Sequence, residues 1–399
     1  MNYKKDFKFL EKNIIYFDNG ATSLKPKCIL ESITSYYNDY PMNAHRGDYK
    51  LSMLTSNLYE RTRDKVRDFI GAKDSKEIVF TSGTTESLNM IIKGYFKYAL
   101  NEGDEVIISK SEHASLILPF LELEKEMGIK IKYASLDDNY RLTVDSIKNE
   151  INDNTKVIAL SHISNVIGDK RDINEITKLA HEKGILVVVD AAQSLGHTLV
   201  DVTSMDIDFL AGSAHKMCGP MGVGILYAKE YLMKDIKPIV TGGGVTVSFS
   251  EDEIVYKDYP FNLEAGTRNV PGVIALGDTI DYLNSIGIDK IEEYVLDLRK
   301  YLIDKLSSLD NLDIYNKDID GSTIIFNVKN VFAQDTSLYL DRKGICVRSG
   351  DHCDKMLHEV TGVKNTVRIS LYFYNTKEEC DKVLDALNND NILEESLGI

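Results

Sequence analysis

The sequence predicts an α/β protein: a large domain, built on a mostly parallel sheet flanked by helices, precedes a smaller α+β C-terminal domain. Short apolar runs alternate with helical patterns over most of the 399 residues, and this βαβ order predicts a parallel sheet covered by helices. The runs are rich in Val and Ile and do not alternate with polar residues, as in strands buried on both faces. Near residue 285 the pattern changes to long helices separated by strand-like segments.

In the large domain, the apolar runs predict six strands, at 77–83, 104–109, 156–162, 185–190, 208–213 and 222–228. Helical patterns occupy three of the connections, at 84–96, 111–128 and 173–184. Because two parallel strands must be joined by a long crossover, usually a helix, this alternation is what a parallel sheet requires.

In the smaller domain, the expected helices and strands lie at 289–308 (helix), 321–330 (strand), 367–375 (strand) and 376–390 (helix). No repeat, low-complexity tract or proline-rich linker interrupts the chain. We therefore expect a large domain at 15–284 and a small domain at 285–399, with residues 1–14 packed on the small domain.

The composition excludes several classes of function. The net charge is -15, which provides no basic surface for nucleic acid. No apolar run approaches the ~18 residues of a membrane span, and the charged N-terminal segment lacks the apolar core of a secretion signal. The five cysteines form no CxxC pair that would indicate a metal site or a disulfide framework. We expect a cytoplasmic protein that binds neither nucleic acid nor membrane.

Polar side chains cluster where the predicted strands end. In open α/β sheets, ligands bind beyond the carboxyl ends of the strands. The polar residues found there are Thr84, Thr85, His113, Asn165, Asp190, Ser213, His215 and Lys216. So many polar residues at one predicted edge indicate a binding site.

Two of these residues indicate the cofactor. Lys216 stands in FLAGSAHKMCGPMGVG, among glycines and small residues. Asp190 ends the apolar run ILVVV and is expected to be buried, where a carboxylate needs a cationic partner. A lysine that binds an aldehyde, together with an aspartate that pairs with a protonated pyridine nitrogen, is the arrangement that holds pyridoxal phosphate (PLP). The SGTT turn at 82–85 offers N–H groups and hydroxyls to a phosphate.

These residues also have structural explanations when each is taken alone. Residues such as Asp190 and Thr84 frequently cap helices, and residues such as Asn165 and Gln193 frequently stabilise turns. A single histidine or lysine in a loop is more often structural or solvated than functional. It is the joint occurrence of these residues at one edge that favours a PLP site.

Ten motifs extend in order over nearly the whole chain: YFDNGATSLKP, NAHRGDYKLS, TSGTTESLN, SEHASL, SHISNVIG, VVVDAAQSLGH, SAHKMCGPMGVGILYAKE, EAGTRN, VRSGDHC and VRISLYFYN. In this order they resemble the Suf-type (group II) PLP-dependent cysteine desulfurases of the class-V aminotransferase family. The resemblance implies PLP fold type I with a seven-stranded sheet in the large domain, and a homodimer.

The resemblance implies a role for each matched residue at the cofactor ring. Lys216 would bind the cofactor's aldehyde, and Asp190 would pair with its pyridine nitrogen. His113 would stack on the ring and transfer protons. Asn165 and Gln193 would contact the ring oxygen or the substrate.

At the phosphate end, the resemblance implies that Thr84, Thr85, Ser213 and His215 bind the phosphate. Thr267 matches a residue that the family sends across a dimer interface to the phosphate of the second subunit.

For the substrate, the resemblance implies that Arg368 grips the carboxylate, a task suited to a bidentate guanidinium, and that His45 and Asn165 contribute contacts. Cys353 matches the nucleophile. The implied reaction converts L-cysteine to L-alanine: Lys216 removes the α-proton, and the Cys353 thiolate takes the sulfur as a persulfide. The sulfur would then pass to an acceptor protein and an iron–sulfur scaffold.

The segment around the nucleophile departs from the family. The family commonly has GHHC, whereas this chain has GDHC, with Asp351 at the first histidine. A carboxylate there opposes ionisation of the Cys353 thiol, while Arg348 and His352 are expected to favour the thiolate. The chain also departs from the family at Cys218, Arg268 and Gln334.

Three alternatives remain open at this stage: a selenocysteine lyase, another PLP lyase of the family, and a catalytically silent scaffold subunit. The other cysteines are expected to play no catalytic part. Cys346 is predicted to face a core, and Cys28, Cys218 and Cys380 are predicted to be buried and inert.

Overall fold

The computed structural model describes residues 3–389 and 391–397. Asp390, the last residue of the helix predicted at 376–390, therefore lies outside the described residues, as do residues 1–2 and 398–399. In the described part of the chain, no helix is both long enough and apolar enough to cross a membrane.

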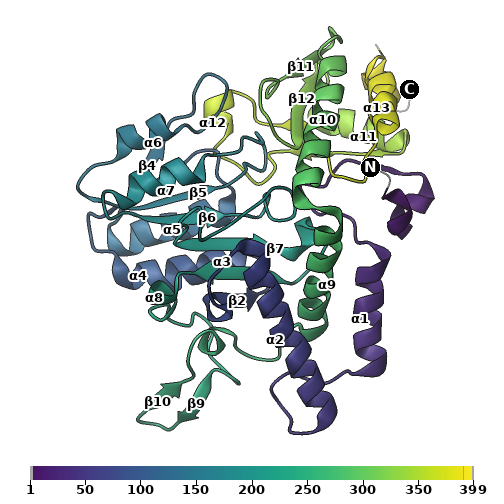
Figure 1. Ribbon diagram of the computed structural model, residues 1–399. Coiled ribbons are helices and arrows are strands. Elements are labelled where there is room, and N and C mark those ends of the chain that lie inside the picture. The colour runs from purple at the N-terminus through teal and green to yellow at the C-terminus, as the bar shows by residue number, and fades with distance from the viewer. Residues whose placement is uncertain (1–2, 390, 398–399) are drawn as a thin grey trace.

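Seven strands form the central sheet, in the order β2-β8-β7-β6-β5-β3-β4 (Figure 1). Strand β8 runs antiparallel to its neighbours β2 and β7, and every other pair is parallel. The bounds in sheet order are Ile78–Thr81, Gly224–Ala228, Phe209–Ser213, Leu186–Asp190, Thr155–Ser161, Glu105–Ser109 and Lys130–Ala134. The mostly parallel seven-stranded sheet is thus confirmed.

The edge strand β4 is the one strand of this sheet that the apolar runs did not predict. Its sequence, KIKYA, is largely exposed or half-buried. An edge strand pairs on one side only and carries charged residues that discourage further pairing, so its sequence lacks the continuous apolar run of a central strand.

Helices cover both faces of the sheet. The helices of the large unit are α1 (Lys27–Asp39), α2 (Lys50–Ile70), α3 (Thr84–Ile91), α4 (Lys97–Ala99), α5 (Ala114–Met127), α6 (Val144–Glu150), α7 (Ile173–His181), α8 (Glu230–Met233) and α9 (Val270–Ile286). A π-helical segment, Ile92–Phe96, joins α3 to α4.

Neighbouring residues of one strand pack in two separate hydrophobic cores. In β3, Val106 and Ile108 pack in a cluster with residues of α3 and α5, whereas Ile107 packs in a second cluster with residues of α7 and α9. Because side chains of a strand alternate between faces, an uninterrupted apolar run fills both cores. This explains why the central strands read as continuous apolar runs in the sequence.

The C-terminal part of the chain forms a second, antiparallel sheet, in the order β11-β12-β15-β14. Its elements are α10 (Ile288–Leu306), β11 (Leu312–Ile314), β12 (Thr323–Val328), α11 (Ala333–Arg342), β13 (Ile345–Cys346), β14 (Arg348–Gly350), α12 (His358–Thr361), β15 (Thr366–Ser370), α13 (Lys377–Leu387) and α14 (Ile392–Leu397). Gly287, with φ of 95°, separates α9 from α10. The exact division at 284/285 stays a prediction.

The N-terminal segment lies against this C-terminal part. The buried ring of Phe7 packs on Tyr374, with 4.5 Å between ring centroids, and on Phe373 at 5.9 Å. Strand β1 (Ile15–Tyr16) pairs with β13 in parallel. The chain then crosses to α1 and the large unit, so the segment around residue 18 runs between the two sheets.

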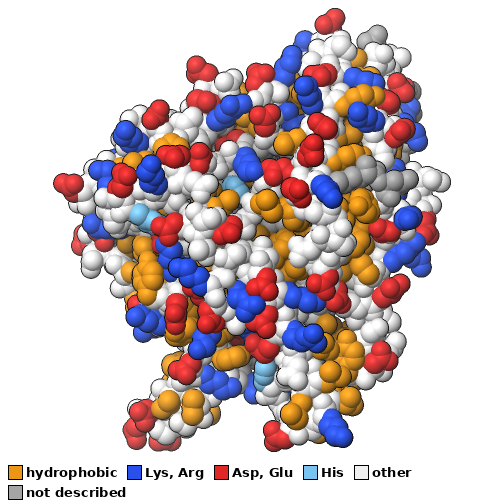
Figure 2. Space-filling view, viewed as in Figure 1, with side chains coloured by type: hydrophobic (Ala, Val, Ile, Leu, Met, Phe, Trp, Pro, Cys, Tyr) orange, Lys and Arg blue, Asp and Glu red, His pale blue; other side chains and the backbone are white. Residues whose placement is uncertain are grey.

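A hairpin of β9 (Thr246–Phe249) and β10 (Ile254–Tyr256) projects from the rest of the molecule, at the lower left of Figure 1. Figure 2 shows apolar side chains among acidic ones on this projection. Val247 and Phe249 are 71% and 78% exposed, which is unusual for side chains of this size.

Candidate active site

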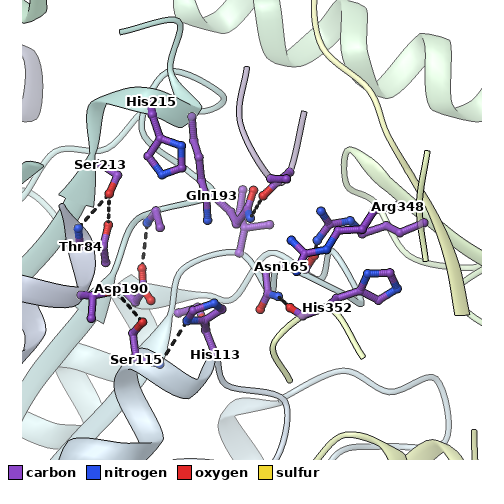
Figure 3. A pocket seen from close by; sticks show the side chains of 18 residues that line it. Thr84, His113, Ser115, Asn165, Asp190, Gln193, Ser213, His215, Arg348 and His352 are labelled. Carbon is purple, nitrogen blue, oxygen red and sulfur yellow. Dashed lines mark hydrogen bonds between the residues drawn. The ribbon is translucent and has the colours of Figure 1, made fainter. Parts of the chain in front are cut away.

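A cavity of about 200 Å³ opens at the carboxyl ends of the central strands (Figure 3). Its lining residues are Gly20, Ala21, Thr84, Thr85, His113, Ser115, Ser161, Ile163, Asn165, Asp190, Ala192, Gln193, Ser213, His215, Lys216, Arg348, His352 and Arg368. Strands β14 and β15 bring arginines to the cavity from the C-terminal sheet. The site is thus built from both sheets.

Lys216 follows β7 on a short 3₁₀ turn, Ala214–Lys216. Burial lowers the pKa of its amine to about 8, and the positive charge of Arg368 acts in the same direction, whereas Asp190 opposes the shift. An amine with this pKa is partly neutral near physiological pH. It can therefore act as a nucleophile toward an aldehyde and as a base.

Asp190 ends β6 on the floor of the cavity and is buried. Burial raises the pKa of its carboxyl to about 6, although the N–H of Ala192, 2.9 Å from Oδ1, favours the ionised form. A buried carboxylate gains from a cationic partner. A protonated pyridine nitrogen in the cavity would supply that partner.

His113 caps the N-terminus of α5, where its Nδ1 accepts the N–H of Ser115 at 3.1 Å. Burial lowers the pKa of the imidazole to about 4, and the charge of Lys216 adds to this shift. The ring is therefore neutral and carries its proton on Nε2. A neutral aromatic ring facing the cavity (Figure 3) suits stacking on a flat cofactor.

The end of the cavity formed by α3 and β7 carries hydroxyls and N–H groups. The Thr84 N–H donates to Ser213 Oγ at 2.8 Å, and the two hydroxyls of these residues lie 2.8 Å apart. Thr85 bonds to Ser115 through their hydroxyls at 2.7 Å. A Cβ at Gly224 would lie 2.5 Å from Gly83, so this glycine lets β8 approach the turn closely. Such a helix N-terminus binds anions such as phosphate.

His215 completes this end of the cavity. Burial lowers the pKa of its imidazole to about 4, and the charge of Lys216 adds to the shift. The His215 ring is neutral and can donate one hydrogen bond to an anion without a net charge of its own.

At the opposite end of the cavity, Figure 3 shows Arg348 of β14, and Arg368 of the neighbouring strand β15 also lines the cavity. The Arg368 guanidinium is buried and donates to the Asn165 carbonyl at 2.7 Å and to Asp18 Oδ1 at 3.3 Å. Burial lowers its pKa to about 10, so it stays charged at neutral pH. A Cβ at Gly20 would lie 2.9 Å from this guanidinium, so a larger residue at position 20 would displace the Arg368 side chain.

Asn165 and Gln193 lie between the two ends. The Asn165 amide donates to the His352 carbonyl at 2.9 Å, and the Gln193 amide donates to the Gly20 carbonyl at 3.0 Å. These bonds tie the large sheet to the turn that carries Cys353 and to the segment that packs on Arg368.

Cys353 lies on the turn after β14, next to His352 and in contact with Arg348, two residues that line the cavity. Arg348 Nη2 lies 3.2 Å from its sulfur, and the Cys353 N–H donates to Asp351 Oδ1 at 3.0 Å. The predicted role of His352 is wrong: its Nε2 bonds to Thr366 Oγ1 at 2.9 Å, and burial lowers its pKa to about 3. Of the two residues expected to favour a thiolate, only Arg348 contacts the Cys353 sulfur with a charged group.

The remaining cysteines differ from Cys353 in their surroundings. Cys218 and Cys380 are buried, and burial raises the pKa of each thiol to about 12, so both are inert as predicted. Cys28 is exposed, which corrects the prediction that it is buried. Cys346 is half-buried in β13, where it pairs with Tyr16 of β1.

Two predicted site residues lie outside this cavity. His45 bonds to Glu60 at 3.1 Å and lines a second cavity with Arg46, Lys257 and Arg268. Thr267 lines a third cavity with Ser82 and Glu86 among other residues. Within one chain, neither residue joins the residues around Lys216, and their roles stay predictions.

Sequence reasoning missed several residues that line or support the cavity. Ser115 supplies the N–H that orients His113, and Asp18 and Gly20 pack around Arg368. A signal was present, because these residues lie within the motifs SEHASL and YFDNGATS. The motifs were recognised as wholes, but these positions were not assigned individual tasks.

The residues of the cavity fit PLP. Two residues that line this cavity, Asn165 and Arg368, each have a buried polar atom, Oδ1 and Nε respectively, without a hydrogen-bond partner among the described residues. An amine, a buried carboxyl and a hydroxyl-rich helix N-terminus match, in turn, the aldehyde, the pyridine nitrogen and the phosphate of that cofactor.

The model of the class-V aminotransferase family matches residues 15–383. The chain belongs to the class-V aminotransferase family. Its members are PLP enzymes, so PLP is the cofactor of this chain. When bound, PLP draws electrons from the α-carbon of an attached amino acid.

Curated relatives and solved structures extend this match. A probable cysteine desulfurase of Halalkalibacterium halodurans is 36% identical over 96% of both chains. A cysteine desulfurase of Haloferax volcanii is 36% identical over 94% of this chain and 89% of its own length. Among solved structures, the cysteine desulfurase of Thermococcus onnurineus has a TM-score of 0.93 at 36% identity, covering 99% of this chain and 98% of that one. The cysteine desulfurase CsdA of Escherichia coli has a TM-score of 0.92 at 34% identity, covering 98% of each chain.

We expect Lys216→Ala to lose the covalent attachment of PLP, because no other lysine lines the cavity among the described residues. The visible absorption band of the lysine-bound cofactor should disappear, and activity should fall by at least about 1000-fold. Lys25→Ala is the matched control, since its ammonium bonds to the His215 carbonyl at 2.8 Å outside the lining. A purified Lys216→Ala protein that keeps the wild-type band would contradict the assignment.

Proposed function

We propose that the chain is a cysteine desulfurase that converts L-cysteine to L-alanine and takes the sulfur onto Cys353 as a persulfide. The observation that carries the proposal is a thiol beside a guanidinium: Cys353 Sγ lies 3.2 Å from Arg348 Nη2, and Arg348 lines the cavity that fits PLP. A nucleophilic thiol must ionise to react, and a neighbouring cation favours that form.

Arg368 binds the carboxylate of the substrate in this proposal. Its Nε is unpaired within the part of the chain that the structure describes, and a guanidinium binds a carboxylate with paired hydrogen bonds. Asn165 lies beside it with a free amide oxygen, which suits the substrate's ammonium or amine. The substrate is thereby oriented with its side chain toward Cys353.

Lys216 and His113 move protons. The amine of Lys216, with its pKa of about 8, takes the α-proton, and it returns a proton to the product carbon after the sulfur has left. The neutral His113 ring holds its proton on Nε2 toward the cavity, since Nδ1 accepts the Ser115 N–H.

Sulfur transfer needs no outside oxidant. The Cys353 thiolate attacks the substrate sulfur, the new S–S bond forms, and the C–S bond breaks with its electron pair on the β-carbon, which is then protonated. Overall, L-cysteine and the Cys353 thiol give L-alanine and a Cys353 persulfide. The need for a thiol that accepts the sulfur distinguishes a desulfurase from the other lyases of the family, which require no thiol at this position.

We further propose that a sulfur-acceptor protein collects the persulfide and supplies iron–sulfur cluster assembly in the cytoplasm. Cys353 is half-buried and so within reach of a partner. Helix α11 packs on β14, the strand that leads into the Cys353 turn. Leu338 of this helix and Phe332, which directly precedes it, have exposed side chains. Exposed apolar side chains of this size suit a protein partner.

Cys353→Ala should lower alanine formation from L-cysteine on the order of 1000-fold or more, because the sulfur acceptor is removed. Its PLP absorption band should be unchanged. Cys346→Ala, seven positions earlier in the chain, is the matched control and should keep most of the activity. Mass spectrometry of wild-type protein after incubation with L-cysteine should find one added sulfur on the Cys353 peptide.

A persulfide on Cys346, or full L-cysteine activity in Cys353→Ala, would reject Cys353 as the nucleophile. The same assay with L-selenocysteine tests the alternative substrate: activity confined to selenocysteine in wild-type protein would reject the desulfurase proposal in favour of a selenocysteine lyase.

We also propose a homodimer in which Thr267 completes the phosphate site of the partner subunit. Thr267 lines a different cavity of its own chain from the one that Lys216 lines. The projecting β9–β10 hairpin exposes Val247 and Phe249, and the first turn of α2 exposes Leu51 and Met53. A two-fold dimer would cover such surfaces and make the Thr267 contact reciprocal.

A hybrid dimer tests the contact made by Thr267. In a dimer of a Lys216→Ala chain with a Thr267→Ala chain, one site receives an intact Lys216 from one chain and an intact Thr267 from the other. We expect that site to bind PLP with wild-type affinity, whereas the Thr267→Ala homodimer should bind it about tenfold more weakly, as for one lost hydrogen bond. Equal weakening in the hybrid, or an active monomer in sedimentation at micromolar concentration, would contradict the proposal.

A further inference from the structure

The turn that carries Cys353 is held closed by hydrogen bonds to the large unit. The Cys353 carbonyl accepts the N–H of Ala114 at 3.1 Å, at the start of α5. The His352 carbonyl accepts the amide of Asn165 at 2.9 Å. Both His352 and Cys353 have positive φ, 54° and 64°, a region that costs energy for residues other than glycine. The closed turn therefore stores strain and depends on what holds it.

The side chain of Asp354, the next residue, lies in an unusual environment. It is 3% exposed, and neither side-chain oxygen has a hydrogen-bond partner in the described part of the chain. The N–H of Leu357 forms its bond to the Asp354 backbone carbonyl, at 3.4 Å. The carboxyl lines a small cavity of about 20 Å³, which has room for about one water molecule. An ionised carboxylate in this place would lack compensation.

The charged groups around Asp354 also oppose its ionisation. Burial raises the pKa of this carboxyl to about 8, and the negative charge of Glu112 adds to the shift. Arg171 opposes it, but this guanidinium is already paired with Glu112 in a fully buried ion pair. The titratable and charged groups that line the small cavity are Asp351, His352, Asp354, His358 and Lys364. Asp354 is therefore neutral at pH 7.

We propose that Asp354 is a positioning residue: the Cys353 turn stays closed on the active site while Asp354 is neutral, and ionisation of Asp354 opens the turn and exposes the Cys353 thiol. An ionised Asp354 reaches water by moving outward, and because it follows Cys353 directly, the strained turn moves with it. The role of this motion in sulfur transfer rests on the proposed function, but the motion itself does not.

The direction of the pH effect follows from linkage. In the open turn, Asp354 is solvated and ionises near the ordinary aspartate pKa of about 3.9. In the closed turn it ionises near 8. Opening therefore releases a proton between these values, and the ratio of open to closed turn rises by up to about tenfold per pH unit. Above pH 8 both forms are ionised, and the ratio levels off.

The test is the rate at which iodoacetamide alkylates Cys353 in the holoenzyme, followed by mass spectrometry of the Cys353 peptide from pH 6 to pH 9. Ionisation of the thiol raises the rate in every variant, so the informative quantity is the rate of wild type divided by that of Asp354→Asn. This variant keeps the shape of the side chain but cannot ionise. We expect the ratio to rise at least tenfold between pH 6 and pH 8 and to level off above.

Glu359→Gln is the matched control, because Glu359 lies in the same segment but is exposed and paired with Lys110 on the surface. The alkylation rate of wild type divided by that of Glu359→Gln should stay constant within twofold from pH 6 to pH 9. Asp354→Ala is the second variant, should Asp354→Asn not fold. The proposal is overturned if the wild-type ratio to both Asp354 variants stays constant within twofold from pH 6 to pH 9. Alkylation needs no L-cysteine, so this result is independent of whether Cys353 accepts sulfur.

Discussion

Burial of opposite charges in one cavity is the physical constraint on which the site depends. Lys216, Asp190 and Arg368 meet at the carboxyl edge of the central sheet, where burial moves the pKa of each toward its neutral form. Asp190 lowers the cost of burying the charge of Lys216 only in part, and the like charge of Arg368 adds to that cost. A PLP molecule with a cationic ring nitrogen, together with a substrate carboxylate, supplies the partners that the protein leaves missing.

The two sheets supply different side chains to the active site. The central sheet supplies Lys216 and Asp190 from rigid strand ends, while the C-terminal sheet supplies two arginines that lie directly opposite each other, Arg348 on β14 and Arg368 on β15. Two like charges at directly opposite positions repel each other. Each guanidinium has another partner: Arg368 contacts Asp18, and Arg348 contacts the Cys353 sulfur. The docking of the two sheets thus determines where the thiol stands relative to the lysine.

Much of this arrangement was accessible from the sequence, because central strands of a parallel sheet are continuous apolar runs and their carboxyl ends are where ligands bind. Lys216, Asp190 and His113 were found in this way, and the structure brings them to one cavity. The edge strand β4 was missed because its exposed, charged residues lack that pattern.

Properties that arise from long-range packing were not accessible. The role of His352 was misjudged because its partner, Thr366, lies on a different strand. The burial of Asp354 was equally hidden, since a sequence such as GDHCD is typical of an exposed turn. Residues distant in the sequence, such as Val166, Tyr315 and Ile325, line the small cavity beside that carboxyl.

The most direct test of the charge balance is the pH dependence of PLP loading onto the apoenzyme, followed by the growth of visible absorption. The rate should rise with a midpoint near pH 8 as Lys216 loses its proton. Arg368→Gln removes a cation and should move the midpoint to higher pH, whereas Asp190→Asn removes an anion and should move it to lower pH. Shifts in the same direction, or no shift in either variant, would contradict the account.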